Sequence, residues 1–134
     1  MKKCIWLSAF FLFAKISAAQ YSLAFCENVT AEGSPQKVSS SFTVGNNGGA
    51  VKILLRSDEE FNTDQLKFAV YYINTEGNEE EVAKLPQKVE PAWNFTWKEI
   101  ELFNAGTYRV KVYNGKGTYL TSANLNVKRG ETDK

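Results

Sequence analysis

Residues 106–127, GTYRVKVYNGKGTYLTSANLNV, give the clearest indication of the fold. Their apolar and polar side chains alternate with period two on both sides of residues 114–117, the pattern of strands that bury one face and expose the other. Residues 114–117 read Asn-Gly-Lys-Gly, and Asn and Gly readily accept the positive φ angles of a tight turn. The stretch therefore predicts a β-hairpin.

The same alternation extends towards the N-terminus, interrupted by turn residues about every eight to twelve positions. We predict eight strands, at residues 21–25, 38–44, 51–56, 66–74, 80–85, 93–103, 108–113 and 119–127. The charges of residues 80–85 and the following Pro86 are typical of an edge strand. Because there is no helical periodicity, repeat or linker, the sequence predicts an all-β fold: a single antiparallel sandwich of about seven to eight strands, with a small closed barrel as the alternative.

Residues 104–110, NAGTYRV, resemble the tyrosine corner of immunoglobulin-like domains, in which a Gly and a Tyr open the sixth strand and the Tyr hydroxyl bonds back across the corner. The resemblance gives structural roles to Gly106 and Tyr108. Val110 stands where antibody domains place a cysteine, so the resemblance is to the broad immunoglobulin and fibronectin type III group and to no specific family. It implies an immunoglobulin-like β-sandwich, with binding or spacing roles expected before catalysis.

Residues 1–19 differ from the rest of the chain. Two lysines precede an apolar run, and residues 17–19, Ser-Ala-Ala, supply the small side chains that a signal peptidase reads. The apolar run is shorter than the roughly 20 residues of a membrane-spanning helix. The sequence therefore predicts a bacterial secretory signal peptide, cleaved between Ala19 and Gln20, and an exported protein that is periplasmic, cell-surface or extracellular. An uncleaved N-terminal anchor is the alternative.

Cleavage would leave the sandwich domain at 20–128 and a polar tail at 129–134. The 16 basic residues of the chain would fall to 13 against 15 acidic residues, a net charge of −2. This balance argues against a nucleic-acid partner, and no membrane span would remain in the mature chain. Cys26 would be the single cysteine, which we expect to be buried in the first strand, with pairing between chains or lipid attachment as alternatives.

The sequence from residue 20 onwards contains no catalytic pattern. It has no His, its one Cys therefore has no His partner, and no Gly-rich phosphate loop precedes a helix. Acidic loops at 58–64 and 76–81 offer oxygen ligands for calcium, but neither has the spacing of the helix-loop-helix calcium motif, and we prefer to interpret both as solvated loops. We therefore predict no catalytic residue, no metal and no cofactor, and a chain that is not an enzyme.

Two sets of apolar residues conflict in the predicted strand 93–103. Three aromatic residues share one parity and two aliphatic residues share the other: Trp93, Phe95 and Trp97 against Ile100 and Leu102. Both sets cannot face the core of a regular strand. A β-bulge near residues 98–99 would shift the phase and bury both sets. We prefer this interpretation because Trp and Phe usually bury most of their surface.

In the alternative, the strand is regular and the aromatic side chains form an exposed platform. The candidate ligand-binding residues are then Trp93, Phe95, Trp97, Glu99 and Glu101. Sugars stack their C–H faces on aromatic rings while carboxylates accept hydrogen bonds from their hydroxyl groups. Large exposed apolar patches usually mark an interaction site.

The sequence favours an exported, non-enzymatic binding or scaffolding module that recognises a protein or a cell-surface component. A carbohydrate-binding module that uses the aromatic platform is the alternative, with a cell-surface glycan as its partner. A small carboxylate-dependent hydrolase is a third hypothesis. A secreted inhibitor or chaperone that acts through an edge strand is a fourth. The sequence does not indicate an oligomeric state.

Overall fold

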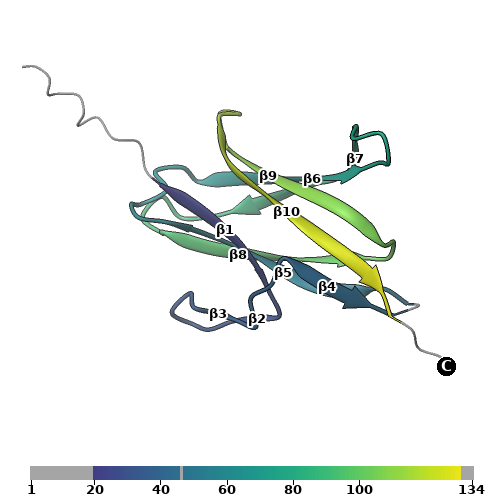
Figure 1. Cartoon of the computed structure of the whole chain (residues 1–134). Helices are drawn as coiled ribbons and strands as arrows, with labels where there is room; N and C mark the ends of the chain where they lie inside the picture. Colours follow the sequence, from purple (N-terminus) through teal and green to yellow (C-terminus); the bar gives the residue numbers. More distant parts are fainter. Residues whose placement is uncertain (1–19, 46, 131–134) are drawn as a thin grey trace, which may run out of the picture.

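The computed structural model describes residues 20–45 and 47–130 (Figure 1). The predicted signal peptide at 1–19 and residues 131–134 of the predicted tail lie outside the described residues. The described part contains ten strands: β1 (Tyr21–Cys26), β2 (Asn28–Val29), β3 (Pro35–Gln36), β4 (Ser41–Val44), β5 (Gly49–Ser57), β6 (Gln65–Ile73), β7 (Glu79–Lys88), β8 (Phe95–Leu102), β9 (Gly106–Asn114) and β10 (Tyr119–Arg129).

The strands form two stacked sheets and a separate small hairpin. One sheet has the order β1-β5-β8 and the other the order β4-β10-β9-β6-β7, while β2 pairs with β3. Each pairing is antiparallel apart from β4 with β10, which is parallel. The prediction of an all-β antiparallel sandwich is confirmed, with the parallel pairing of β4 and β10 as an exception, and the two separate sheets exclude the closed barrel. β7 lies at a sheet edge, as its charges and Pro86 predicted.

The core lies between the two sheets and follows from the alternation of the sequence. Its side chains come from the inward positions of the long strands: Val51, Ile53, Leu55, Leu66, Phe68, Val70, Ile100, Leu102, Tyr108, Val110, Val112, Leu125 and Val127. Full burial of a Val, Leu, Ile or Phe side chain contributes about 1.5–3 kcal/mol. The predicted hairpin of residues 106–127 supplies one wall of this core.

The corner before β9 has the geometry that the immunoglobulin resemblance implies. The Tyr108 hydroxyl donates a hydrogen bond to the Asn104 carbonyl at 2.8 Å, and its ring meets that of Tyr72 edge to face. Burial raises the pKa of the Tyr108 hydroxyl. Gly106 has a φ of 146°, and a Cβ at this position would overlap with the Tyr72 ring. The corner therefore requires glycine there.

The connection from β1 to β4 contains a hairpin, β2–β3, that the sequence analysis missed. It lies on the side of the three-stranded sheet that faces away from the other sheet (Figure 1). Its turn residue Gly33 is buried against the ring of Phe95, where a Cβ would come within 2.8 Å of the ring. Cys26 and Leu54 point to this outer side and are nevertheless fully buried. Cys26 is therefore a buried free thiol, as expected.

Candidate binding site on the open side of the sandwich

β8 is a regular strand along its whole length. It pairs with β5 without a register shift from Phe95 to Leu102. Thr96 and Ile100 face the core, whereas Trp97 is 40% exposed. The β-bulge that we preferred near residues 98–99 is therefore wrong.

The outward aromatic side chains of β8 are partly covered by contacts outside the main core. Phe95 packs against the buried Gly33 of the β2–β3 hairpin. Trp97 lies opposite Leu54 in the sheet, and the Lys52 ammonium lies 5.3 Å from the centroid of the Trp97 ring. A cation over an indole face is a favourable contact. This local cover explains why a regular strand is stable with aromatic residues on its outer face.

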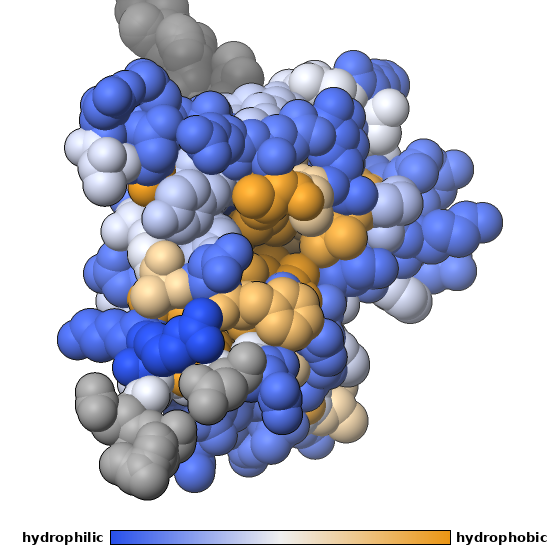
Figure 2. Space-filling view, turned by 90° about the vertical axis from the view of Figure 1, so that its right-hand side faces the viewer, coloured by the Kyte–Doolittle hydropathy of each residue, from blue (hydrophilic) through white to orange (hydrophobic). Residues whose placement is uncertain are grey.

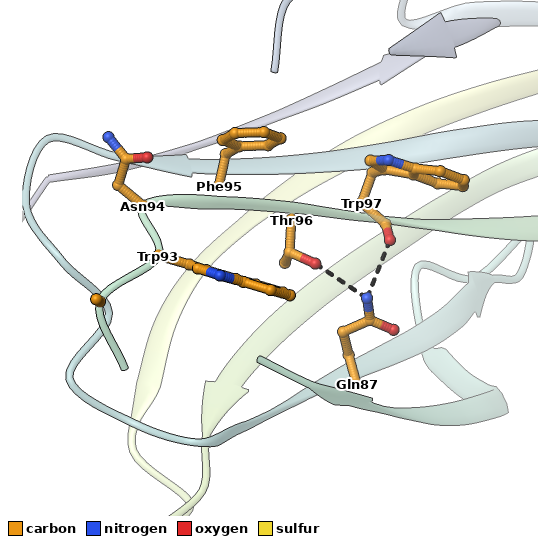
Figure 3. A pocket seen from close by; sticks show the side chains of 7 residues that line it. Gln87, Trp93, Asn94, Phe95, Thr96 and Trp97 are labelled. Atoms are coloured by element: carbon orange, nitrogen blue, oxygen red, sulfur yellow. Dashed lines mark hydrogen bonds between the residues drawn. The ribbon is translucent and has the colours of Figure 1, made fainter. Parts of the chain in front are cut away.

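Trp93 does not share the face of Phe95 and Trp97. The chain turns just before β8, where the Trp93 N–H donates to the Glu90 carbonyl at 3.0 Å and the Trp93 carbonyl accepts from the Phe61 N–H at 2.8 Å. In Figure 3 the Trp93 ring lies on the side of β8 that carries Thr96, and Phe95 and Trp97 lie on the opposite side. The three aromatic side chains wrap around the edge strand instead of forming a flat platform.

A cavity that we call the aromatic hollow lies beside these residues, between the sheet edges β7 and β8. It has a volume of about 590 Å³ and is lined by Gln87, Ala92, Trp93, Asn94, Phe95, Thr96 and Trp97. Trp93 is 46% exposed. A concave site with mostly apolar walls and a few placed polar groups is the usual form of a small-ligand site. The aromatic hollow has this composition.

Gln87 supplies a polar side chain to the aromatic hollow, and hydrogen bonds to β8 fix its position. Gln87 Nε2 donates to Thr96 Oγ1 at 2.9 Å and to the Trp97 carbonyl at 3.2 Å (Figure 3). Both amide hydrogens are thereby used, which leaves the carbonyl oxygen of the Gln87 side chain as an acceptor. Within residues 20–45 and 47–130, neither Trp93 nor Trp97 uses its indole N–H in a hydrogen bond. The aromatic hollow therefore has an unused acceptor in the Gln87 carbonyl oxygen and an unused donor in the Trp93 indole N–H.

The carboxylates predicted beside the aromatic residues lie elsewhere. The Glu99 side chain pairs with Lys52 at 3.5 Å, and neither Glu99 nor Glu101 lines the aromatic hollow. The structure therefore brings Trp93, Phe95 and Trp97 to one site without the two acids. Gln87 takes the polar position instead. No signal in the sequence could have identified Gln87, because its role depends on how the edges of two different sheets meet.

A second cavity, which we call the apolar hollow, lies further along the same side of the sandwich. It has a volume of about 430 Å³ and is lined by Val70, Val82, Ala83, Leu85, Glu99, Ile100, Glu101, Leu102, Phe103, Asn104 and Tyr108. Figure 2 faces the right-hand side of the view in Figure 1, and it shows hydrophobic side chains gathered in a hollow and surrounded by hydrophilic ones. Between the two hollows the Lys98 ammonium donates to the Pro86 carbonyl at 3.3 Å and bridges β8 to β7.

The acidic loops at 58–64 and 76–81 do not converge. In the described part of the chain, no group of three or more His, Cys, Asp or Glu side chains is placed to hold a metal ion. Over the same residues, no helix has the length and apolar character that a membrane crossing requires.

Comparisons with known proteins identify the fold class but not the function. No protein-family model matches the chain, and no curated protein matches its sequence. Among solved structures, an immunoglobulin-like protein from Pseudomonas aeruginosa matches 84% of this chain and 98% of its own, with 13% identity and a TM-score of 0.52. The fold is immunoglobulin-like. The broad resemblance drawn from residues 104–110 is therefore confirmed, and identity this low carries the fold alone.

Two further matches have lower TM-scores. The CARDB domain of a protein from Pyrococcus furiosus, solved in complex with di-metal ions, has 10% identity and a TM-score of 0.44, covering 84% of this chain and 94% of its own. A superoxide reductase (neelaredoxin) from Ignicoccus hospitalis has 9% identity and a TM-score of 0.47, covering 89% of this chain and 87% of its own.

The prediction that the chain is not an enzyme needs correction. It rested in part on the expectation that an immunoglobulin-like sandwich binds before it catalyses. Superoxide reductases stand among the matched structures at 9% identity, so the prediction is withdrawn, and a match at this level assigns no activity to this chain. The physical reason is that a sandwich is a scaffold, and chemistry depends on the site that is built on it. Enzymatic activity is left open by the fold.

Proposed function

We propose that the chain is an exported binding domain that recognises a carbohydrate chain in the aromatic hollow. One observation carries the proposal: Trp93 and Trp97 are 46% and 40% exposed, and both line a single cavity that the fixed amide of Gln87 also lines. Large exposed aromatic side chains that gather around one cavity usually mark an interaction site.

The chemistry of the aromatic hollow suits a sugar. The C–H faces of a pyranose ring stack on indole rings, and its hydroxyl groups need both donors and acceptors. The Trp93 indole N–H and the Gln87 carbonyl oxygen supply these, and the exposed amide of Asn94 adds more.

Export is supported by the sequence of residues 1–19 and fits the start of the folded domain. β1 begins at Tyr21, immediately after the predicted cleavage site. The backbone N–H of Gln20 donates to an Asp58 carboxylate oxygen at 2.9 Å. After cleavage this nitrogen is an α-ammonium, so the new N-terminus would form an ion pair there. The intact mass of the protein recovered from a bacterial host should then begin at Gln20; a mass that includes residues 1–19 contradicts export with cleavage.

The binding test uses protein that starts at Gln20, in which Trp93 and Trp97 are the only tryptophans. We would titrate it with cellohexaose, xylohexaose, maltohexaose and chitohexaose, and record the emission maximum and acrylamide quenching. At least one oligosaccharide should shift the emission and protect it from quenching. Trp93→Ala and Trp97→Ala should each weaken that binding roughly tenfold or more, about 1.4 kcal/mol.

The matched control is Tyr119→Ala, which removes an aromatic side chain that is 53% exposed on β10, away from the aromatic hollow. It should leave binding unchanged. The proposal fails if no oligosaccharide alters the emission, or if the Tyr119 variant loses as much affinity as the tryptophan variants.

A further inference from the structure

The two sheets differ in width, and this leaves one edge of β8 uncovered. β8 is the edge of a three-stranded sheet, and it faces a five-stranded sheet whose edge is β7. No strand of the described chain lies beside the free edge of β8, so Ala83 and Leu85 on the inner side of β7 are only partly buried. The apolar hollow occupies the place where a fourth strand of the narrower sheet would lie.

The backbone of β8 presents hydrogen-bonding groups to this empty place. In an antiparallel pair, the N–H and C=O groups of alternate residues point to the partner strand, and those of the residues between point away from it. The Trp97 carbonyl accepts a hydrogen bond from Gln87 on the open side. Glu99 and Glu101 have the same parity, so their backbone groups also point to the open side. The bridge from Lys98 to Pro86 leaves residues 99–103 as the accessible part of the edge.

The side chains of this edge specify what a neighbouring strand must carry. Ile100 and Leu102 face inward and form one wall of the apolar hollow, whereas Glu99 and Glu101 face outward. Side chains of an added strand alternate in the same way, and opposite charges on neighbouring strands attract. Glu101 has no ion pair within the described residues. A strand beside β8 therefore needs apolar residues inward and basic residues outward.

Two exposed apolar side chains at the rim of the apolar hollow support the binding of a further strand beside the free edge of β8. The pairing of β6 with β7 shifts register between Val70 and Tyr71, and the resulting bulge leaves Val82 unpaired. Val82 is 53% exposed and Phe103 is 51% exposed, and both line the apolar hollow. Bulges commonly re-aim a side chain at a sheet edge. A strand seated beside β8 would cover both side chains.

We propose that the β8 edge binds an extended segment of a partner protein, in which apolar and basic residues alternate, as a fourth strand of the three-stranded sheet. The apolar side chains enter the apolar hollow and the basic ones pair with Glu99 and Glu101. Main-chain hydrogen bonds supply affinity and the alternating side chains supply specificity. This surface is distinct from the aromatic hollow and does not depend on sugar binding.

The test uses two synthetic peptides and isotope-labelled protein that starts at Gln20. In one peptide Lys alternates with Val and Leu, and in the other every Lys is replaced by Glu. We would follow binding by NMR and measure hydrogen exchange of the backbone amides. The Lys peptide should slow exchange at Glu99 and Glu101 and bind at least tenfold more tightly than the Glu peptide. Trp93→Ala and Trp97→Ala should not alter this binding, whatever their effect on sugars.

Charge reversal gives a matched pair of variants. Glu101→Lys should weaken binding of the Lys peptide about fivefold or more, because an attractive cross-strand pair becomes a repulsive one. Glu60→Lys changes the net charge equally at an exposed loop position beyond the opposite end of β8, and it should have little effect.

Four results would overturn the proposal. They are unchanged exchange at Glu99 and Glu101, equal binding of the two peptides, an equal loss in both charge variants, and protection of the same amides in a dimer of the protein alone. The last result would mean that a second copy of this chain is the occupant.

Discussion

The outer faces of the two sheets, both built from alternating strands, meet solvent in different ways. On the three-stranded sheet, Leu54 and Cys26 point outward and are fully buried, because the β2–β3 hairpin lies over them. On the five-stranded sheet, the outward positions carry charged and polar side chains that remain in contact with water, among them Glu79, Arg109 and Lys111. The outer face of the three-stranded sheet therefore forms a small additional core, whereas the outer face of the five-stranded sheet is a solvated ionic surface.

The parity of a residue in a strand therefore fixes the face of the sheet on which its side chain lies, but not whether that face is shielded from water. The dry face depends on a hairpin of two-residue strands, which has little structure of its own. It is also the face on which Phe95 and Trp97 stand, so the cover and the aromatic hollow share a wall.

The largest effect is expected at Leu54. Leu54→Ala should lower the free energy of unfolding by about 2–4 kcal/mol, because it empties a fully buried site beneath the hairpin. Lys128→Ala, at an exposed outward position of β10 whose side chain makes no hydrogen bond or ion pair within the described residues, should change it by less than about 0.5 kcal/mol. Urea denaturation of both variants measures the difference. Similar values for the two would show that the outer face of the three-stranded sheet is not a core.

A smaller effect is expected at Gly33, where the hairpin touches Phe95. Gly33 and Gly77 both have a φ of 86°, but a Cβ at Gly33 meets the Phe95 ring and a Cβ at Gly77 meets nothing within 4 Å. Gly77→Ala should cost about 1–2 kcal/mol from backbone strain alone. Gly33→Ala should cost roughly 1 kcal/mol more from overpacking, and it should also shift the tryptophan emission. If both substitutions lowered the free energy of unfolding equally and left the emission unchanged, the hairpin would not influence the aromatic hollow.

The same contrast explains how much the sequence could predict. Alternation and turn residues predicted each of the eight long strands, because both depend on neighbours in the chain. The β2–β3 hairpin was missed because its strands are two residues long and show no period, although Gly33 and Pro35 marked a turn. The bulge in β8 was predicted wrongly for the same reason: without the hairpin, nothing outside the sheet could cover Phe95.

The candidate site was predicted in part. The aromatic residues were found because their spacing is visible in the sequence, whereas the face of Trp93 depends on a turn before β8 that changes the parity. Gln87 and the free edge of β8 were not found, since both depend on the relative width of two sheets. Contacts within a strand are encoded locally, and contacts between the edges of different sheets are not.

The smallest effect is expected on the solvated face, at Glu79. Hydrogen bonds from Lys111 and Arg109 hold the pKa of the Glu79 carboxyl below its ordinary value of 4.5. A lowered pKa in the folded state means that the stabilisation is present above pH 4.5 and is lost as the pH falls through the lowered value. The melting temperature of the protein should therefore fall more steeply below pH 4.5 than that of Glu79→Gln, and the two should converge at the acidic end.

Glu76→Gln is the control for this pH profile, because it removes an exposed carboxylate that makes no ion pair within the described residues. Its profile should follow that of the unmodified protein. Added salt should reduce the difference between the unmodified protein and Glu79→Gln, because the side chains of Glu79, Lys111 and Arg109 all remain partly exposed. Added salt should leave the loss of unfolding free energy in Leu54→Ala nearly unchanged, because that loss comes from an apolar cavity. If salt altered both equally, the distinction between a dry face and an ionic face would not hold.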